Sequence, residues 1–369
     1  MGNIITGVFI AFLISFYAIP IIIQLAEQAK LYDVPDARKV HKKPIPSLGG
    51  LGIFIGFMMG LLLTEFIHVN ALQYYYAAFL VVFFYGIKDD ILKLKPMKKI
   101  LGQLIVSLIL IFKAELVITN MYGFLGVTYI IPSFAYLFTM MTIIVIMNAY
   151  NLIDGIDGLA GSLGILTSSV FGLFFYLNGD MFYALLGFVL SGSLFSFLIY
   201  NYSPAKIFMG DTGSMLLGLI NAILAIHFIE TAGGSALIPA LKLTSPAAAF
   251  GILAVPLLDT LRVFGIRILH GHSPFFPDRN HLHHLLLDRG FNHKQILFTL
   301  VGVAIAFMFG TYFALPLGST IVIGLQAVVF FLGVYLLSRV PKHKKHLTVV
   351  REDFILSVDE SKLGSAKKH

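Results

Sequence analysis

Residues 141–175 read MTIIVIMNAYNLIDGIDGLAGSLGILTSSVFGLFF, which is two apolar runs joined by a short acidic turn. The apolar segments 131–149 and 159–177 are each close to the roughly 20 residues that a helix needs to cross a bilayer. Asp154 and Asp157 lie in the turn, and a glycine follows each of them. Because charge inside a membrane protein is costly and is usually functional, this stretch predicts a membrane hairpin with a functional turn.

The same apolar character extends over most of the chain and excludes a water-soluble globule. Of the 369 residues, 58% are hydrophobic and 12% are charged, against about 45–50% and about 25% in soluble domains. The chain has no cysteine, which excludes disulfides, zinc–thiolate sites and thiol nucleophiles. We predict an all-α, polytopic membrane protein with ten or eleven transmembrane helices, and an exterior loop or re-entrant piece at 114–130. The predicted segments are 4–24, 49–69, 72–87, 100–113, 131–149, 159–177, 181–199, 213–230, 246–266, 295–313 and 317–338.

Lysine and arginine predict the orientation of these segments. With the N-terminus outside, 23 of the 26 basic residues fall in cytoplasmic connections or in the C-terminal tail. Only Lys113 and Lys242 fall in exterior loops, and Arg262 lies inside a segment. Since cytoplasmic loops are enriched in basic residues, the N-terminus is expected outside and the C-terminus in the cytoplasm. The net charge of +7 then reflects anchoring at the membrane surface, and no nucleic-acid partner is expected.

Under this topology the aspartates near the segment ends face the cytoplasm together. They are Asp89, Asp90, Asp154, Asp157 and Asp211, with Asp259 inside segment 246–266. Clustered carboxylates repel one another unless a cation joins them, and oxygen ligands suit Mg²⁺ bound with substrate phosphates. Glycines beside Asp154, Asp157 and Asp211 allow backbone N–H groups to approach an anion closely. The pattern therefore predicts a site for a metal-bound diphosphate at a membrane surface.

Each of these features also has an alternative interpretation, as a structural element or as a site for another metal. The Asp89–Asp90 pair could be a solvated helix end, and Asp211 could cap the helix that follows it. The turn at Asp154 resembles a calcium loop but lacks the downstream glutamate. The stretch His281–His284 could bind zinc. Asp259 could simply pair with Arg262, three residues further along one helix.

Five motifs in order make the chain resemble the polyprenyl-phosphate N-acetylhexosamine-1-phosphate transferases, an integral-membrane family. The resemblance covers about residues 1–338, so we expect this part to form the catalytic domain and 339–369 to form a basic, disordered tail. The motifs are His41-Lys-Lys-Pro-Ile-Pro-Ser-Leu-Gly-Gly50, Asp89-Asp90, Asn151-Leu-Ile-Asp-Gly-Ile-Asp-Gly158, Phe208-Met-Gly-Asp-Thr-Gly-Ser214 and Pro277-Asp-Arg-Asn-His-Leu-His-His284.

The resemblance implies a role for individual residues. It implies Mg²⁺ as the cofactor, with Mn²⁺ as a substitute, on Asp211 and Asp154. Phe208 is expected to stack on uracil, and Lys42, or Lys43 if the alignment shifts, to lie beside the diphosphate. The implied catalytic residues are Asp89, Asp90, Asp154, Asp157, Asp211 and His281. The implied substrate-binding residues are Lys42, Lys43, Asn151, Phe208, Arg267, Arg279, His283 and His284.

The resemblance also implies a reaction and its partners. The chain is expected to transfer N-acetylhexosamine 1-phosphate from a UDP-sugar to undecaprenyl phosphate on the cytoplasmic face of the bacterial inner membrane, releasing UMP. Leu282 interrupts the histidine triplet of the phospho-MurNAc-pentapeptide transferases, so UDP-GlcNAc is the favoured donor and that peptidoglycan enzyme is the alternative. A secondary transporter is a remote alternative. Direct attack and a covalent aspartyl intermediate both stay open, as does the choice between a monomer and a homodimer.

Overall fold

The chain folds into a bundle of helices with two very short sheets. A computed structural model describes residues 2–33, 44–64, 71–234, 245–273 and 280–342. Its elements in chain order are α1 (Gly2–Gln28), β1 (Tyr32–Asp33), β2 (Ile45–Pro46), α2 (Gly49–Leu62), α3 (Leu72–Leu92), α4 (Pro96–Phe112), β3 (Asn120–Phe124), β4 (Val127–Tyr129), α5 (Pro132–Ile153), α6 (Leu159–Leu177), α7 (Met181–Asn201), α8 (Gly210–Ala232), α9 (Ser245–Ile252), α10 (Ala254–Leu269), α11 (Leu282–Leu287), α12 (His293–Ala314), η2 (Leu315–Leu317) and α13 (Ser319–Arg339).

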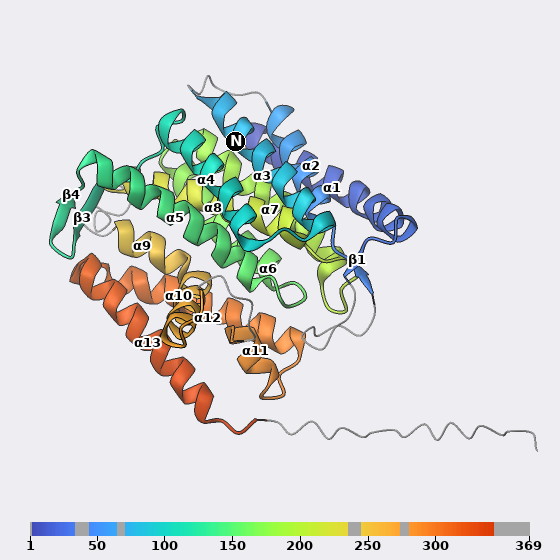
Figure 1. Cartoon of the computed structure of the whole chain (residues 1–369). Coiled ribbons are helices and arrows are strands. Elements are labelled where there is room, and N and C mark those ends of the chain that lie inside the picture. The colour runs from blue at the N-terminus through green and yellow to red at the C-terminus, as the bar shows by residue number, and fades with distance from the viewer. Residues whose placement is uncertain (1, 34–43, 65–70, 235–244, 274–279, 343–369) are drawn as a thin grey trace, which may run out of the picture.

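Helix α8 is the centre of the bundle. It contacts α2, α3, α5, α6, α7 and α9, and 94% of its most apolar window is buried, against 17% for α13. A helix that is apolar on all sides is stable only when it is surrounded, either by protein or by lipid. Figure 1 shows α9 to α13 packed together on one side of the bundle that α1 to α8 form. The start of α8 is therefore held by the core, whereas α13 lies at the periphery.

The multi-pass helical architecture is confirmed. Within the described residues, seven helices are long and apolar enough to cross a membrane, or eight if α9 and α10 count as one span. The other three predicted segments fall on α2, which has 14 residues, on α3, which ends in charged residues, and on α4, which has 17 residues. The count of eleven and the orientation stay predictions, and most of the predicted tail, 343–369, lies outside the described residues.

The predicted continuous helix over 246–266 is wrong. Helices α9 and α10 meet at an angle of 84° around Leu253. Pro256 has no backbone N–H to donate to the carbonyl of Ile252, which favours a break between α9 and α10 at this point. The break redirects α10 toward the end of the molecule where the acidic residues lie.

The loop predicted at 114–130 contains the hairpin β3–β4, so the chain is not purely helical. Glu230 near the end of α8 accepts hydrogen bonds from the backbone N–H (2.7 Å) and the hydroxyl (2.7 Å) of Thr119, just before the hairpin. The N–H of Leu125 donates to Thr320 Oγ1 at the start of α13 (2.8 Å). These contacts place the hairpin at the opposite end of α8 from Asp211.

Candidate active site

Backbone hydrogen bonds hold the stretch before α8 in place. The N–H of Gly49 donates to the carbonyl of Phe208 (2.9 Å), and the N–H of Gly50 donates to that of Met209 (2.8 Å). A Cβ on Gly50 would lie 2.1 Å from the backbone nitrogen of Gly213, so α2 and α8 approach here as only glycine permits. Two motifs more than 150 residues apart in sequence thus form one rigid support for Asp211.

Asp90 caps the N-terminus of α8 from a neighbouring helix. Its carboxylate accepts hydrogen bonds from the N–H of Asp211 (2.6 Å), the N–H of Thr212 (3.1 Å) and the hydroxyl of Thr212 (2.6 Å). A carboxylate at this position satisfies unpaired N–H groups and interacts favourably with the helix dipole. The resemblance implies a role for Asp90 at the catalytic centre, which stays a prediction, and its contacts show that it orients the backbone of Asp211.

The side chain of Asp211 has cationic and neutral partners. Lys99, in the first turn of α4, forms ion pairs with Asp211 (2.9 Å) and with Asp89 (2.5 Å). The amide of Asn151 donates to Asp211 Oδ1 and also to the hydroxyl of Ser214 (2.9 Å). Side chains of α4 and α5 therefore converge on the carboxylate of Asp211 in the first turn of α8.

Asp89, Asp90, Asn151, Asp211 and Ser214 line a cavity of about 370 Å³ at this end of the bundle, which we call the acidic cavity. It receives residues from distant parts of the chain, since Ser47 before α2 and His293 of α12 both contribute to its wall. Eight of the residues predicted from sequence meet in it. Its lining residues are Ser47, Asp89, Asp90, Lys93, Asn151, Asp154, Gly155, Ile156, Asp157, Asn201, Phe208, Gly210, Asp211, Ser214, His284 and His293.

The carboxylates of the acidic cavity lie close together, and Lys99 forms ion pairs with two of them, Asp89 and Asp211. Burial, followed by the charges of Asp211, Asp90 and Asp157, raises the pKa of Asp154 to about 8. Burial also raises the pKa of Asp90 to about 7. Burial and the charge of Asp211 raise the pKa of Asp89 to about 6, although Lys99 opposes them. A bound cation would relieve this repulsion.

The donor set fits Mg²⁺ only as a partial site. Within the described residues, no three His, Asp or Glu side chains form a preformed metal site, and this includes the histidines considered for zinc. Mg²⁺ usually takes one or two carboxylates and completes its shell with water and substrate phosphates. The charged groups near Asp154 are other carboxylates, and after burial Asp211 has the largest effect on its pKa. Asp154 and Asp211 together therefore suit an ion that arrives with a diphosphate.

Asp157 has a different role from Asp154. Its Oδ2 lies 3.2 Å from Nδ1 of His293 and accepts the N–H of Ala205 (3.2 Å). Although burial raises its pKa, the hydrogen bond and charge of His293 hold the pKa of Asp157 below its usual range. Asp157 therefore orients His293, which begins α12 and reaches the cavity wall.

Sequence reasoning missed Lys99 and His293. In the sequence analysis, Lys99 is only one of the basic residues that predict the orientation. Pro96 nevertheless marks the start of the helix whose first turn carries Lys99. His293 follows Asn292, which caps α12 in a reciprocal pairing with Gln295 (2.9 Å each way). The capping pattern could have located this helix start, but nothing local connects it with Asp157.

Three predicted site residues, Arg267, His281 and His283, lie in a separate, buried cluster around Asp259 and do not line the acidic cavity. Asp259 accepts from Arg262 (3.0 Å), from the N–H of Leu282 (3.0 Å) and from Nδ1 of His281 (3.0 Å). Nε2 of His281 faces Arg267 at 3.5 Å. We call these side chains, with His283, the Asp259 cluster. The expected Asp259–Arg262 pair is present, and the hydrogen bond from the N–H of Leu282 to Asp259 also holds the start of α11 against α10.

His283 joins the Asp259 cluster to the acidic turn. Its ring is stacked on that of His281 (5.7 Å between centroids), and a Cβ on Gly155 would lie 2.4 Å from His283 Nε2. Burial lowers the pKa of His283 to about 3, so the ring is neutral. The cluster therefore packs on the turn that carries Asp154. Lys42, Lys43 and Arg279 lie outside the described residues, so their predicted roles stay predictions.

Comparisons with known proteins match most of the chain. Residues 72–229, from α3 to α8, match the model of the family Glycosyl transferase family 4. A probable undecaprenyl-phosphate N-acetylglucosaminyl 1-phosphate transferase of Bacillus subtilis is 32% identical over 89% of both chains. A decaprenyl-phosphate N-acetylglucosaminephosphotransferase of Mycobacterium leprae is 31% identical over 86% of this chain and 88% of its own. An undecaprenyl-phosphate alpha-N-acetylglucosaminyl 1-phosphate transferase of Escherichia coli is 27% identical over 77% of both.

Proposed function

This chain belongs to glycosyl transferase family 4, the polyprenyl-phosphate N-acetylhexosamine-1-phosphate transferases, and we propose that it transfers GlcNAc 1-phosphate from UDP-GlcNAc to undecaprenyl phosphate. A lipid-phosphate oxygen attacks the β-phosphorus of UDP-GlcNAc, the bond from that phosphorus to the bridging oxygen breaks, and UMP leaves with the bridging oxygen. The observation that carries this proposal is the acidic cavity, where carboxylates from three regions of the chain meet at the end of apolar helices.

The residues around Asp211 position the diphosphate. Asp211 and Asp154 would hold Mg²⁺, which when bound neutralises charge on the diphosphate oxygens. Asp90 fixes the backbone of Asp211, and Lys99 adds a positive charge beside it. A phosphate monoester has a second pKa of about 6, so the lipid phosphate is mostly dianionic at neutral pH and needs little help from a general base.

The donor is proposed to lie with its base toward Phe208. This ring precedes Asp211 by three residues and lines the same cavity, so uracil can stack on it while the diphosphate lies at the carboxylates. The names of the relatives favour GlcNAc as the sugar.

The test supplies the purified chain with undecaprenyl phosphate, Mg²⁺ and equimolar UDP-GlcNAc and UDP-MurNAc-pentapeptide. We expect UMP release and a lipid product with the mass of undecaprenyl-diphosphate-GlcNAc. A product that carries mainly the pentapeptide would move the chain to the peptidoglycan reaction. No UMP release with either donor would overturn the proposed activity.

We further propose that the helices cross the bacterial inner membrane eleven times, with the acidic cavity on the cytoplasmic face. This assignment counts α2, α3 and α4 as spans and the α9–α10 pair as one. The basic residues of the connections support it. A reporter fused after Lys95 should therefore be cytoplasmic and one at Gly234 exterior, and labelling of both from one side would show that the number of spans is wrong.

A further inference from the structure

A long apolar groove lies between α12 and α13, away from the acidic cavity. Its volume is about 660 Å³. On each helix the lining residues span 16 positions, Thr299 to Ala314 and Val322 to Leu337, so the groove extends for roughly 22 Å at about 1.5 Å per residue step. This is about three quarters of the roughly 30 Å thickness of the hydrocarbon layer.

The protein itself does not fill this groove. Gly310 of α12 and Gly333 of α13 both line it, and a Cβ added to either would meet no atom within 4 Å. The two helices are also the least enclosed of the late spans, with 28% and 17% of their apolar windows buried. In a bilayer, an apolar groove of this length is filled by hydrocarbon.

The end of the groove near α11 is basic. Leu286 and Leu337 line it there, and Arg289 donates through Nε to the carbonyl of Leu337 and through Nη1 to that of Leu285 (2.7 Å). Lys342 lies 3.5 Å from Asp288.

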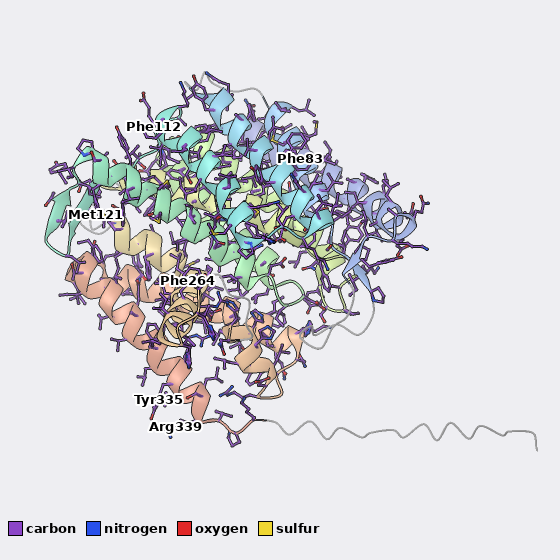
Figure 2. The ribbon with its side chains drawn as sticks, in the orientation of Figure 1. Phe83, Phe112, Met121, Phe264, Tyr335 and Arg339 are labelled. Carbon is purple, nitrogen blue, oxygen red and sulfur yellow. The ribbon has the colours of Figure 1, made fainter. Side chains whose placement is uncertain are left out.

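Arg339 adds a third basic group at the same end of α13. Its guanidinium lies over the ring of Tyr335, 4.8 Å from the centroid, and Figure 2 shows the two residues together where the helix ends. With Arg289 and Lys342 against Asp288, the opening has an excess of two positive charges. Such a basic opening between helices suits an anionic lipid headgroup.

We propose that this groove binds an acyl chain of an anionic phospholipid whose headgroup lies against Arg289, Arg339 and Lys342. The apolar wall provides affinity for the chain, and the basic opening selects the headgroup. This site is separate from the acidic cavity and does not depend on the reaction proposed above.

The absence of tryptophan from the chain allows a direct test. Phe307→Trp places a single tryptophan in the groove. Phe309→Trp, at a position 63% exposed on the same helix, reports on bulk lipid. The full chain is reconstituted in phosphatidylcholine vesicles with increasing fractions of brominated phosphatidylglycerol or brominated phosphatidylcholine. We expect half-maximal quenching of Phe307→Trp at an about fivefold lower fraction of the anionic lipid, and no such preference for Phe309→Trp.

Two further variants separate the chain site from the headgroup site. Gly310→Leu in the Phe307→Trp background should abolish the preference by filling the groove. Gly302→Leu is the matched control, because Gly302 lies on the same helix, outside the groove, and its added Cβ also meets nothing within 4 Å. Lys342→Gln, at an exposed residue, should weaken the preference without filling the groove.

Equal quenching of Phe307→Trp by brominated phosphatidylglycerol and brominated phosphatidylcholine would overturn the proposal, because it would show that the groove takes up lipid without regard to headgroup. If unlabelled undecaprenyl phosphate relieves the quenching and Gly310→Leu raises its KM, the occupant is the isoprenoid chain and the proposal is equally overturned.

Discussion

The acidic cavity and the Asp259 cluster both hold carboxylates beside basic side chains, yet they are built on opposite principles. In the Asp259 cluster, one carboxylate receives an arginine, a histidine and a backbone N–H, all at 3.0 Å. In the acidic cavity, Asp89, Asp90, Asp154 and Asp211 act on one another, and Lys99 is shared between two of them. The Asp259 cluster balances the charge of its carboxylate with its own side chains. The acidic cavity keeps an excess of negative charge that a bound cation would balance.

This difference separates stability from function in physical terms. A fully paired buried charge holds its neighbours in one geometry, and removal of one partner leaves an uncompensated charge in the interior. A crowded, partly exposed set of carboxylates costs stability, and such strain concentrates at functional sites. Variants in the two regions should therefore fail in different ways.

The largest expected effect on catalysis comes from Asp211→Asn. The amide keeps the shape of the side chain but removes the charge that would hold the metal, so turnover should fall by about 1000-fold or more, since metal-borne stabilisation is worth several kcal/mol. The melting temperature should stay near that of the unchanged chain. Near-normal UMP release at saturating Mg²⁺ would remove Asp211 from the metal site.

Asp259→Asn should act mainly on stability. Loss of this carboxylate leaves Arg262 buried without its ion pair, and such changes cost about 3–5 kcal/mol. The melting temperature in detergent should fall clearly, and any protein that stays folded should bind the UDP-sugar with little change in KM. Asp154→Asn is the control, because it should lose turnover while it keeps its melting temperature. A stable but inactive Asp259→Asn protein would instead place the cluster in the catalytic machinery.

Phe208→Ala tests the part of the acidic cavity that is proposed to bind the base rather than the diphosphate. Base–aromatic stacking is worth roughly 1–3 kcal/mol, so KM for UDP-GlcNAc should rise about 5- to 150-fold while KM for undecaprenyl phosphate is unchanged. Initial rates at varied concentrations of each substrate measure both values. An unchanged KM for the nucleotide would contradict the stacking role.

The smallest expected effect is that of His293→Gln. His293 Nδ1 lies 3.2 Å from Asp157 Oδ2 and the ring lines the acidic cavity, and loss of one polar interaction costs about 0.5–1.5 kcal/mol. We expect a drop in kcat/KM of about tenfold, without a change in melting temperature. Lys294→Gln, at the adjacent residue over the ring of Tyr202, should have no such effect. Equal losses in both variants would assign the effect to the start of α12 as a whole.

The residues that sequence reasoning identified belong mostly to short motifs at segment ends. Asp154 and Asp157 share one turn, and Asp211 lies between two glycines at the start of a helix. Such signals are local, because they combine a hydrophobic run, a turn and a charge within about ten residues. Eight predicted site residues do line one cavity, because the helices that carry them all end on the same side.

Pairings between distant segments could not be predicted in this way. Lys99 and Asp211 are 112 residues apart, and no periodicity connects them. The sequence also grouped His281 with His284, although one lies in the buried Asp259 cluster and the other on the cavity wall. Neighbours on a short helix point in different directions, and only the packing of α11 against α10 and α12 decides which side chain reaches which site.

By itself, then, the sequence determined a helical membrane protein and the aspartate motifs of its site, since apolar runs and acidic turns are properties of contiguous residues. Tertiary structure alone decided which carboxylates are compensated and which are not. It buried Asp259 beside Arg262 and His281 and placed Asp154 among other carboxylates. The physical reason is that the free energy of a charge depends on what packs around it, and in this chain those partners come from remote helices.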